Sequence, residues 1–265
     1  MGKSSNAGQR HPETLKSIVK RIPLSIFIYD SLRDVFRYAQ YIASFFRFQQ
    51  AAKQTKKRFS PLKWKDRYPS LGEGTKTTPF DTHYIYHPAW AARIVAQIQP
   101  PVHVDISSTL TFCSIVSAFV PVDFYDYRPA ELNLENLTCK QGNLLKLPFD
   151  DESMESISCM HVIEHIGLGR YGDPLDPDGD LKAIAELKRV LAKGGSLLFV
   201  TPTGKPKIQF NAHRVYSYDQ VISYFDGLHV EQFALVDDND QFIINANPAY
   251  ANQQDYGCGC WWFKK

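Results

Sequence analysis

The chain has 265 residues, a formal net charge of +2 and a composition that is 44% hydrophobic and 22% charged, which is typical of a folded globular protein and excludes a disordered one. The N-terminal MGKSSNAGQR lacks the apolar core of a secretory signal, and no uncharged apolar run approaches the roughly 20 residues that span a bilayer. Five cysteines without a regular framework favour a reducing compartment, so we expect a cytoplasmic protein.

Charge is distributed unevenly along the chain. Residues 1–70 carry 15 Lys or Arg against 4 Asp or Glu, whereas residues 71–265 carry 15 Lys or Arg against 24 Asp or Glu. Segments of opposite charge favour different partners. We therefore expect a basic helical region over residues 1–70 and a separate domain over residues 71–265, joined by the Pro- and Gly-containing stretch at 69–80.

The basic region contains a predicted helix that begins near Asp30, with Ser31 and Asp34 as a capping box. The face of this helix opposite its apolar face carries basic and aromatic residues, and Lys56-Lys57-Arg58 follow the helix in the sequence. We expect this helix to pack on the domain with a solvated basic side. The alternative is that residues 30–65 contact an anionic membrane surface, at the inner face of the cell membrane, or a protein partner. No recognised nucleic-acid-binding module is present in the sequence, so nucleic acid is not expected as a partner.

Beyond residue 100, apolar runs alternate with helical patterns, as a mostly parallel α/β sheet requires. A weaker strand is predicted before Gly142, and the C-terminal aromatic run is predicted to be a further strand. The pattern predicts a Rossmann-like, doubly wound sheet. The clearest strands are predicted over residues 102–106, 122–127, 157–162, 196–201 and 256–263, and helices over 110–119 and 179–193.

Ligands bind such sheets outside the carboxyl ends of the strands. Oxygen-bearing side chains stand at these ends, and they suit the hydroxyls and the exocyclic amine of an adenosine. Asp126, at the end of the second strand, is placed to accept hydrogen bonds from a ribose diol. The candidate cofactor-binding residues are Asp105, Ser107, Asp126, Asn143 and Glu164.

Two runs, GNLLKLPFDDESMESISCMHVIEHI and LKRVLAKGGSLLFVTP, resemble the core of type 11 class I S-adenosylmethionine (SAM)-dependent methyltransferases. FDTHYIYHPAWAARIV, HVDIS, GLGRYGDPLDPDGD, FNAHRVYS and YGCGCWWFKK resemble a branch of that superfamily, the bacterial domain-of-unknown-function family 268, over roughly residues 80–265. The resemblance implies a seven-stranded sheet, SAM as cofactor and methyl transfer. The family's link to surface polysaccharide assembly implies a small or glycan-type acceptor.

One motif departs from the superfamily. Methyltransferases have D-x-G-x-G-x-G after the first strand, and this chain has Asp105-Ile-Ser107-Ser-Thr109-Leu-Thr111. Glycine allows positive φ and close approach of the backbone, whereas β-branched threonine is poorly suited to both. We expect either a different loop path or an altered SAM site. Two other functions therefore stay open: a SAM-independent binding or scaffold protein of polysaccharide assembly, and another transferase or hydrolase that acts on a nucleotide-linked sugar.

Candidate catalytic residues follow the fourth and fifth strands. His165 and His213 are placed to take a proton from an acceptor hydroxyl, and Asp173 is expected to orient His165 or to bind a sugar hydroxyl. His161, on the strand itself, is expected to be structural. The candidate substrate contacts are Arg170, Tyr171, Asn211 and Arg214.

Two of these assignments have alternatives. Arg214 either holds a phosphate or carboxylate of the substrate or pairs with an acidic residue of the chain. The acidic run Asp176–Asp180 contains Pro177 and lacks the bidentate glutamate of an EF-hand, so no metal is expected there. Cys258-Gly-Cys260 has the wrong spacing for a zinc knuckle.

Overall fold

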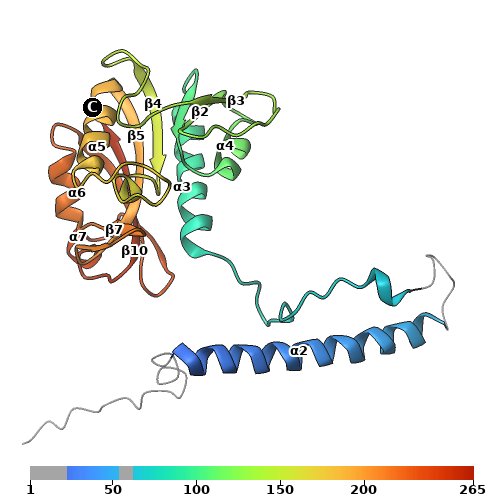
Figure 1. Cartoon of the computed structure of the whole chain (residues 1–265). Helices are drawn as coiled ribbons and strands as arrows, with labels where there is room; N and C mark the ends of the chain where they lie inside the picture. The colour runs from blue at the N-terminus through green and yellow to red at the C-terminus, as the bar shows by residue number, and fades with distance from the viewer. Residues whose placement is uncertain (1–22, 54–61) are drawn as a thin grey trace, which may run out of the picture. The chain divides into compact units, whose positions relative to one another are not determined.

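The computed structural model describes residues 23–53 and 62–265, and the chain divides into two units, Met1–Pro79 and Phe80–Lys265 (Figure 1). The division falls at Pro79, slightly after the boundary predicted at residue 70. Lys56-Lys57-Arg58 lie outside the described residues. No described helix has the length and apolar character needed to cross a membrane.

The first unit contains helix α2 (Pro23–Ala52) and the short 3-10 helix η1 (Trp64–Asp66). The predicted helix is confirmed, but it begins at Pro23, where a proline costs no hydrogen bond because the first helical N–H has no partner within the helix. The predicted capping box is wrong, because Ser31 and Asp34 lie inside the helix. The proposed membrane or partner contact of this unit stays a prediction.

The second unit is built on an eight-stranded sheet of order β3-β2-β1-β4-β5-β10-β8-β9. The five neighbouring strands β3, β2, β1, β4 and β5 run parallel, and β10 pairs antiparallel with both β5 and β8. The doubly wound, mostly parallel sheet is confirmed, with short β9 added as an eighth strand at one edge. The strands are β1 (His103–Ile106), β2 (Val122–Asp126), β3 (Leu137–Gln141), β4 (Met154–Met160), β5 (Leu191–Thr203), β8 (His229–Val236), β9 (Phe242–Ile244) and β10 (Gly257–Lys264).

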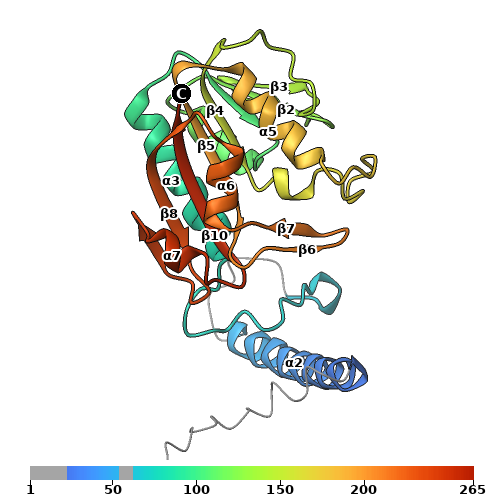
Figure 2. The same ribbon diagram turned by 90° about the vertical axis from the view of Figure 1, so that its left-hand side faces the viewer.

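Helices cover both faces of this sheet (Figure 2). Both faces can be covered because successive side chains of a strand point to opposite faces of the sheet. On β5, Leu197 and Phe199 belong to the buried cluster shared with α5 (Gly179–Val190) and α6 (Tyr218–Tyr224). Leu198 and Val200 belong to the cluster shared with α3 (Thr82–Ile98) and α4 (Leu110–Val116). The remaining elements are η2 (Ile163–His165), β6 (Lys207–Gln209), β7 (His213–Val215) and α7 (Pro248–Ala251).

Helix α3, which the sequence patterns did not predict, places its first turn beside the residues that follow β4. Asp81 caps it by accepting a hydrogen bond from the Tyr84 backbone N–H at 3.1 Å. The Tyr84 ring then stacks on the His161 ring, with 5.3 Å between centroids. This helix therefore contributes side chains to the carboxyl edge of the sheet, where ligands bind in folds of this kind.

Candidate functional site

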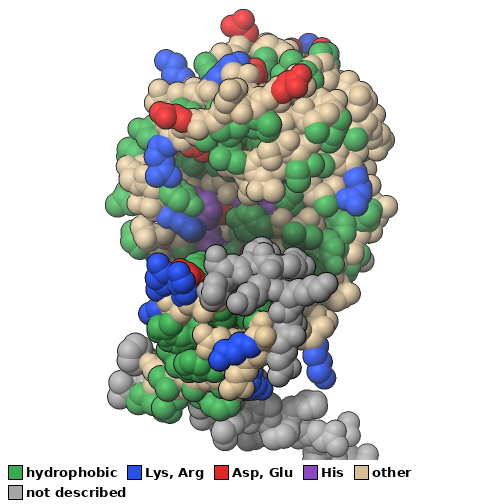
Figure 3. Space-filling view, turned by 90° about the vertical axis from the view of Figure 1, so that its right-hand side faces the viewer, with side chains coloured by type: hydrophobic (Ala, Val, Ile, Leu, Met, Phe, Trp, Pro, Cys, Tyr) green, Lys and Arg blue, Asp and Glu red, His purple; other side chains and the backbone are tan. Residues whose placement is uncertain are grey.

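A polar cavity of ≈ 680 Å³ opens at the carboxyl end of β4, within the size range of small-molecule sites. Figure 3 shows histidine side chains in the hollow on this face. We call it the histidine cavity. Its walls come from the start of α3, the residues after β4, the β6–β7 hairpin and the loops beside β10. It is lined by His83, His161, His165, His213, Tyr84, Tyr171, Tyr256, Arg170, Glu164, Phe80, Asp81, Thr82, Asp237, Asp238 and Asp240.

The cavity brings together five of the predicted site residues. The other seven predicted residues do not line it. Those present are His165, His213, Glu164, Arg170 and Tyr171. Those outside its lining are Asp105, Ser107, Asp126, Asn143, Asp173, Asn211 and Arg214.

His165 is held in one orientation by the β6–β7 hairpin. Its Nδ1 lies 2.6 Å from the Ala212 carbonyl oxygen. A carbonyl only accepts, so Nδ1 carries a hydrogen, and in the neutral imidazole the lone pair is on Nε2, 3.8 Å from Glu164 Oε1. The Arg170 guanidinium donates to the same carbonyl at 3.1 Å. His165 therefore has the arrangement of a general base, and it is oriented by a backbone carbonyl and not by Asp173.

Asp173 instead holds the loop that carries Arg170 and Tyr171. Its carboxylate accepts from the backbone N–H groups of Gly167 at 2.7 Å, Tyr171 at 3.2 Å and Gly169 at 3.4 Å. Because these donors occupy it, the predicted catalytic role of Asp173 becomes a structural one. The Tyr171 ring is exposed and has the guanidinium of Arg170 5.2 Å from its centroid.

Arg214 is buried, with 4% of its surface exposed. Its guanidinium donates to the carbonyl oxygens of Ile166 at 2.6 Å and Pro177 at 3.2 Å, and lies 3.5 Å from the Asp180 carboxylate. The pairing alternative is therefore correct, and the predicted substrate contact is wrong. Asn211, also predicted to contact substrate, is exposed on the hairpin with a φ of 61°.

His213 lines the cavity from β7. Its ring centroid lies 4.9 Å from that of Tyr256 and 6.5 Å from that of His165. Burial lowers the pKa of His213, which favours the neutral imidazole. Its Nε2 is buried and has no hydrogen-bond partner among the residues that the structure describes.

His161 and Glu164 form an almost fully buried pair in the wall of the cavity. His161 Nδ1 donates to Glu164 Oε1 at 2.8 Å, and His161 Nε2 lies 3.4 Å from the sulfur of Cys258. Burial lowers the pKa of His161, but Cys258 and Glu164 raise it by more. Burial raises the pKa of the Cys258 thiol. His161 has a φ of 57°, which is unusual for a residue with a side chain and typical of functional sites.

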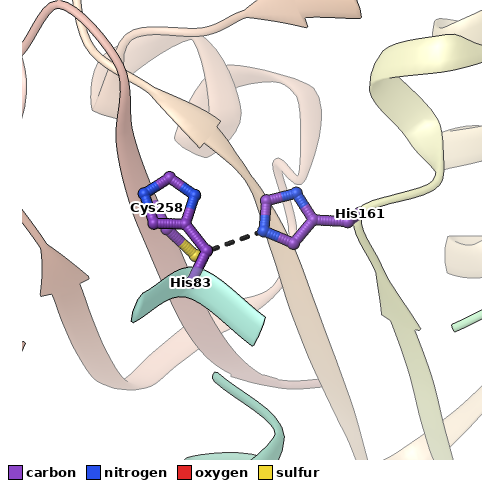
Figure 4. Close-up of side chains that lie close together, drawn as sticks. All are labelled: His83, His161 and Cys258. Atoms are coloured by element: carbon purple, nitrogen blue, oxygen red, sulfur yellow. Dashed lines mark hydrogen bonds between the residues drawn. The ribbon is translucent and has the colours of Figure 1, made fainter. Parts of the chain in front are cut away.

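His83 and His87, four residues apart on α3, complete this region. The His83 ring stacks on His161 at 5.9 Å, and burial lowers its pKa to about 4, so it is neutral at pH 7. Figure 4 shows His83, His161 and Cys258 converging from three elements. Sequence reasoning missed His83 and Cys258. The available signal was the i, i+4 spacing in HYIYH together with the thiols of Cys258 and Cys260.

The changed turn after β1 keeps one left-handed residue. Ser107 has a φ of 56°, and its N–H donates to the Tyr125 carbonyl at 2.8 Å. Thr109 has a φ of −82°, and its hydroxyl caps α4 by accepting from the Phe112 N–H at 3.3 Å. Serine therefore occupies the strained position, and threonine occupies a position that needs no positive φ.

Asp105 supports this turn from inside the protein. It is 0% exposed, and its carboxylate accepts from the Ser108 N–H at 2.9 Å and from the Ser158 hydroxyl. Burial raises its pKa to about 6, against these hydrogen bonds, which lower it. The Ser158 hydroxyl also lies 2.8 Å from His103 Nε2. Asp105 therefore has a structural role, because its buried carboxylate holds the turn through hydrogen bonds. The predicted contact between Asp105 and a cofactor does not fit this position.

Asp126 and Asn143 stand at the ends of β2 and β3. Asp126 is half-buried and accepts from the Arg128 N–H through one oxygen at 2.7 Å. Within the described ranges, no group hydrogen-bonds its second oxygen. Asn143 is exposed, and its side-chain oxygen accepts from the Leu145 N–H at 2.9 Å, which leaves its amide NH₂ available.

Solved structures similar to this chain include three proteins of low identity. The N-methyltransferase NodS from Bradyrhizobium japonicum, in complex with S-adenosylhomocysteine, is 13% identical with a TM-score of 0.49, over 69% of this chain and 87% of that one. The 1,6-didemethyltoxoflavin-N1-methyltransferase of Burkholderia thailandensis is 11% identical with a TM-score of 0.47, over 68% and 79%. YcgJ from Bacillus subtilis is 14% identical with a TM-score of 0.45, over 67% and 99%. At these values the likeness does not assign a reaction.

No curated protein matches the chain. The wider set of sequence motifs resembles the domain-of-unknown-function family 268. That resemblance is confirmed over part of its extent, because residues 148–252 match the family described as Caenorhabditis protein of unknown function, DUF268.

Proposed function

We propose that this chain is a SAM-dependent methyltransferase that methylates a hydroxyl group of a small polar acceptor. SAM would lie along the carboxyl ends of β1 and β2, and the acceptor would occupy the histidine cavity. The observation that carries this proposal is the strand order of the sheet. The order reverses between β1 and β4, and open α/β sheets bind their ligands at that point.

The residues that follow β1, β2 and β3 would hold SAM. The left-handed backbone at Ser107 supports a tight turn next to the cofactor. The second carboxylate oxygen of Asp126 is suited to the ribose diol, and the amide of Asn143 to the adenine edge. When bound, SAM supplies a methyl group on a positively charged sulfur.

The chain's own contribution is to position the acceptor and to remove its proton. His165 Nε2 has a lone pair because Nδ1 donates to Ala212, so it accepts the proton of an acceptor hydroxyl. Arg170 and Tyr171 border the same space and would orient the acceptor. Correct placement of two reactants supplies a large share of such a rate enhancement.

We further propose a glycan-type acceptor. Three tyrosine rings, of Tyr84, Tyr171 and Tyr256, line the cavity between its charged groups. Aromatic faces suit the apolar faces of a sugar ring, and the phenol, imidazole and guanidinium groups suit its hydroxyls. This combination supports a hydroxyl-rich ligand over an apolar one.

Isothermal titration calorimetry with SAM and S-adenosylhomocysteine tests the cofactor. Asp126→Ala should weaken binding more than tenfold, since it removes a charge-assisted hydrogen bond worth about 1.5–3 kcal/mol. Asp123→Ala is the matched control. Asp123 lies on the same strand and is bonded to Lys140, and its removal should leave the affinity unchanged. A correctly folded chain that binds neither compound at millimolar concentration would refute the proposal.

A further inference from the structure

We propose that His83, His161 and Cys258 form a binding site for one divalent transition-metal ion of the zinc type. The open coordination position of this ion would face the histidine cavity. The ligand atoms of the three residues all lie within 4.8 Å of one another. His83 and His161 line the cavity, and Cys258 lies behind them and is fully buried.

The separation of one pair of ligand atoms, Cys258 Sγ and His161 Nε2, fits a metal ion, and His83 offers a nitrogen within 4.8 Å of both. Zn–S bonds of about 2.3 Å and Zn–N bonds of about 2.0–2.1 Å at a tetrahedral angle place sulfur and nitrogen about 3.5 Å apart. Cys258 Sγ and His161 Nε2 are 3.4 Å apart. Two imidazoles and a thiolate are the ligand types that zinc prefers over magnesium or calcium. Three protein ligands with one open position are typical of catalytic zinc sites.

The ligands are held by different elements of the domain. His83 lies in the first turn of α3, His161 directly follows β4, and Cys258 lies near the start of β10. Figure 4 shows the two rings and the sulfur converging. Two of the three ligands, His83 and Cys258, are carried by a helix and a strand, which keep a ligand in position better than a loop does.

Glu164 provides the outer support that a metal-binding histidine usually has. Its Oε1 accepts from His161 Nδ1 at 2.8 Å, so Nε2 is the nitrogen that faces Cys258. A carboxylate behind the imidazole fixes the ring and strengthens the ligand. Glu164 is 1% exposed, and in the described part of the chain its other oxygen has no partner. A positive charge nearby would offset the cost of burying this carboxylate.

His87 packs beside this site and carries an unpaired ring nitrogen of its own. It is 0% exposed, its Nδ1 lies 2.7 Å from the His83 carbonyl, and its ring lies 4.9 Å from that of His161. Its Nε2 is buried and lacks a hydrogen-bond partner among the described residues. Native proteins rarely leave buried polar atoms unpaired.

A second arrangement of the same residues is a nucleophilic cysteine activated by His161 and Glu164. Burial argues against it. Cys258 is 0% exposed and pairs with both neighbouring strands of the sheet, so a substrate cannot approach its sulfur. A single metal ion is far smaller than a substrate and would reach the sulfur from the side of His83 and His161.

Binding is an exchange of a metal ion for a proton. A divalent ion bonds to the two imidazole nitrogens and to sulfur, and the proton shared by Cys258 and His161 leaves to solvent. Resting on the proposed function, the open position would bind the acceptor oxygen. The ion would lower the pKa of the acceptor hydroxyl and ease proton transfer to His165.

The test uses the full-length chain without an affinity tag, stripped of metal by a chelator and titrated with Co²⁺ and then Zn²⁺. We expect about one ion per chain and a near-ultraviolet thiolate-to-cobalt absorption band. His83→Gln should weaken Zn²⁺ binding by about a hundredfold or more, Cys258→Ser should abolish the band, and Glu164→Gln should weaken binding by about 10–100-fold.

Two matched variants control for residue type. His213→Gln removes another cavity histidine, Cys139→Ser removes a thiol on β3, and both should keep the band and the affinity. His83 is only half-buried, so its variant should stay folded by circular dichroism even if the Cys258 variant does not. The proposal is overturned if the wild type gives no thiolate band, or if His83→Gln binds as tightly as the wild type. SAM binding measured in chelator tests the methyltransferase proposal separately.

Discussion

Replacement of Arg214 by methionine should destabilise the domain strongly. Methionine fills much of the same volume but removes every donor of the guanidinium. The carbonyl oxygens of Ile166 and Pro177 and the Asp180 carboxylate lose their partner, and Asp180 itself is only 5% exposed. Loss of one member of a buried ion pair costs about 3–5 kcal/mol.

Urea unfolding followed by tryptophan fluorescence measures this loss. The matched control is the double variant Arg214→Met with Asp180→Asn, which removes the uncompensated charge but keeps a partner for the Tyr216 hydroxyl that donates to Asp180 at 2.8 Å. It should recover at least about 1–2 kcal/mol of the loss. Exposed ion pairs contribute less than about 1 kcal/mol to the free energy of unfolding. If the single variant loses less than this, the structural role of Arg214 is refuted and the prediction that Arg214 contacts the substrate is open again.

Two further predictions concern the region around β1. The backbone at Ser107 has a φ of 56°, and a β-branched side chain is strained in this conformation. Ser107→Val should therefore be about 2 kcal/mol less stable than Ser107→Gly in the same unfolding assay. Equal stabilities of the two variants would contradict the left-handed turn. Burial lowers the pKa of His103 to about 3, whereas the pKa of an unfolded histidine is about 6.5. Between these two pH values the unfolded state binds a proton that the folded state does not. The free energy of unfolding therefore falls as the pH falls from 6.5 to 3, by up to about 1.4 kcal/mol per pH unit. Asp105, with a folded pKa of about 6 against 3.8, binds its proton more tightly when folded and offsets part of the loss. His103→Leu should therefore lose less stability than the wild type between pH 6.5 and 4.5, and identical slopes would contradict this account.

The parallel part of the sheet could be predicted from sequence because its signals are local. The apolar runs of β1, β2 and β5 and the helical spacing of α5 each identify one element without reference to the rest of the fold. Helix α3 was missed because its apolar positions are mixed with histidine and tyrosine, and Pro88 lies within it. That mixture reflects its position, with one end in the core and the other in the cavity.

From the sequence, a residue of the candidate site could be predicted only where the order of strands and helices along the chain is enough to locate it. His165, Arg170 and Tyr171 lie in the segment between β4 and α5, at the carboxyl edge of the sheet, so their nearness to a ligand followed from the sheet. His83 and Cys258 enter the site from opposite ends of the domain, and only the packing of α3 and β10 brings them together. Arg214 illustrates a different limit, because the chemistry of a guanidinium does not reveal whether it faces a ligand or two carbonyl groups of its own chain.

Strand β10 has a consequence for how the domain is made. It is the only link in the described sheet between β5 and the β8–β9 pair, yet the ribosome synthesises it after all of them. Until it arrives, β5 presents an unpaired edge in which Leu197 to Val200 are hydrophobic, and such edges invite pairing with other chains. Until β10 has been synthesised, β5 and the β8–β9 pair cannot join into one sheet, so loss of residues 257–264 would leave two separate half-sheets.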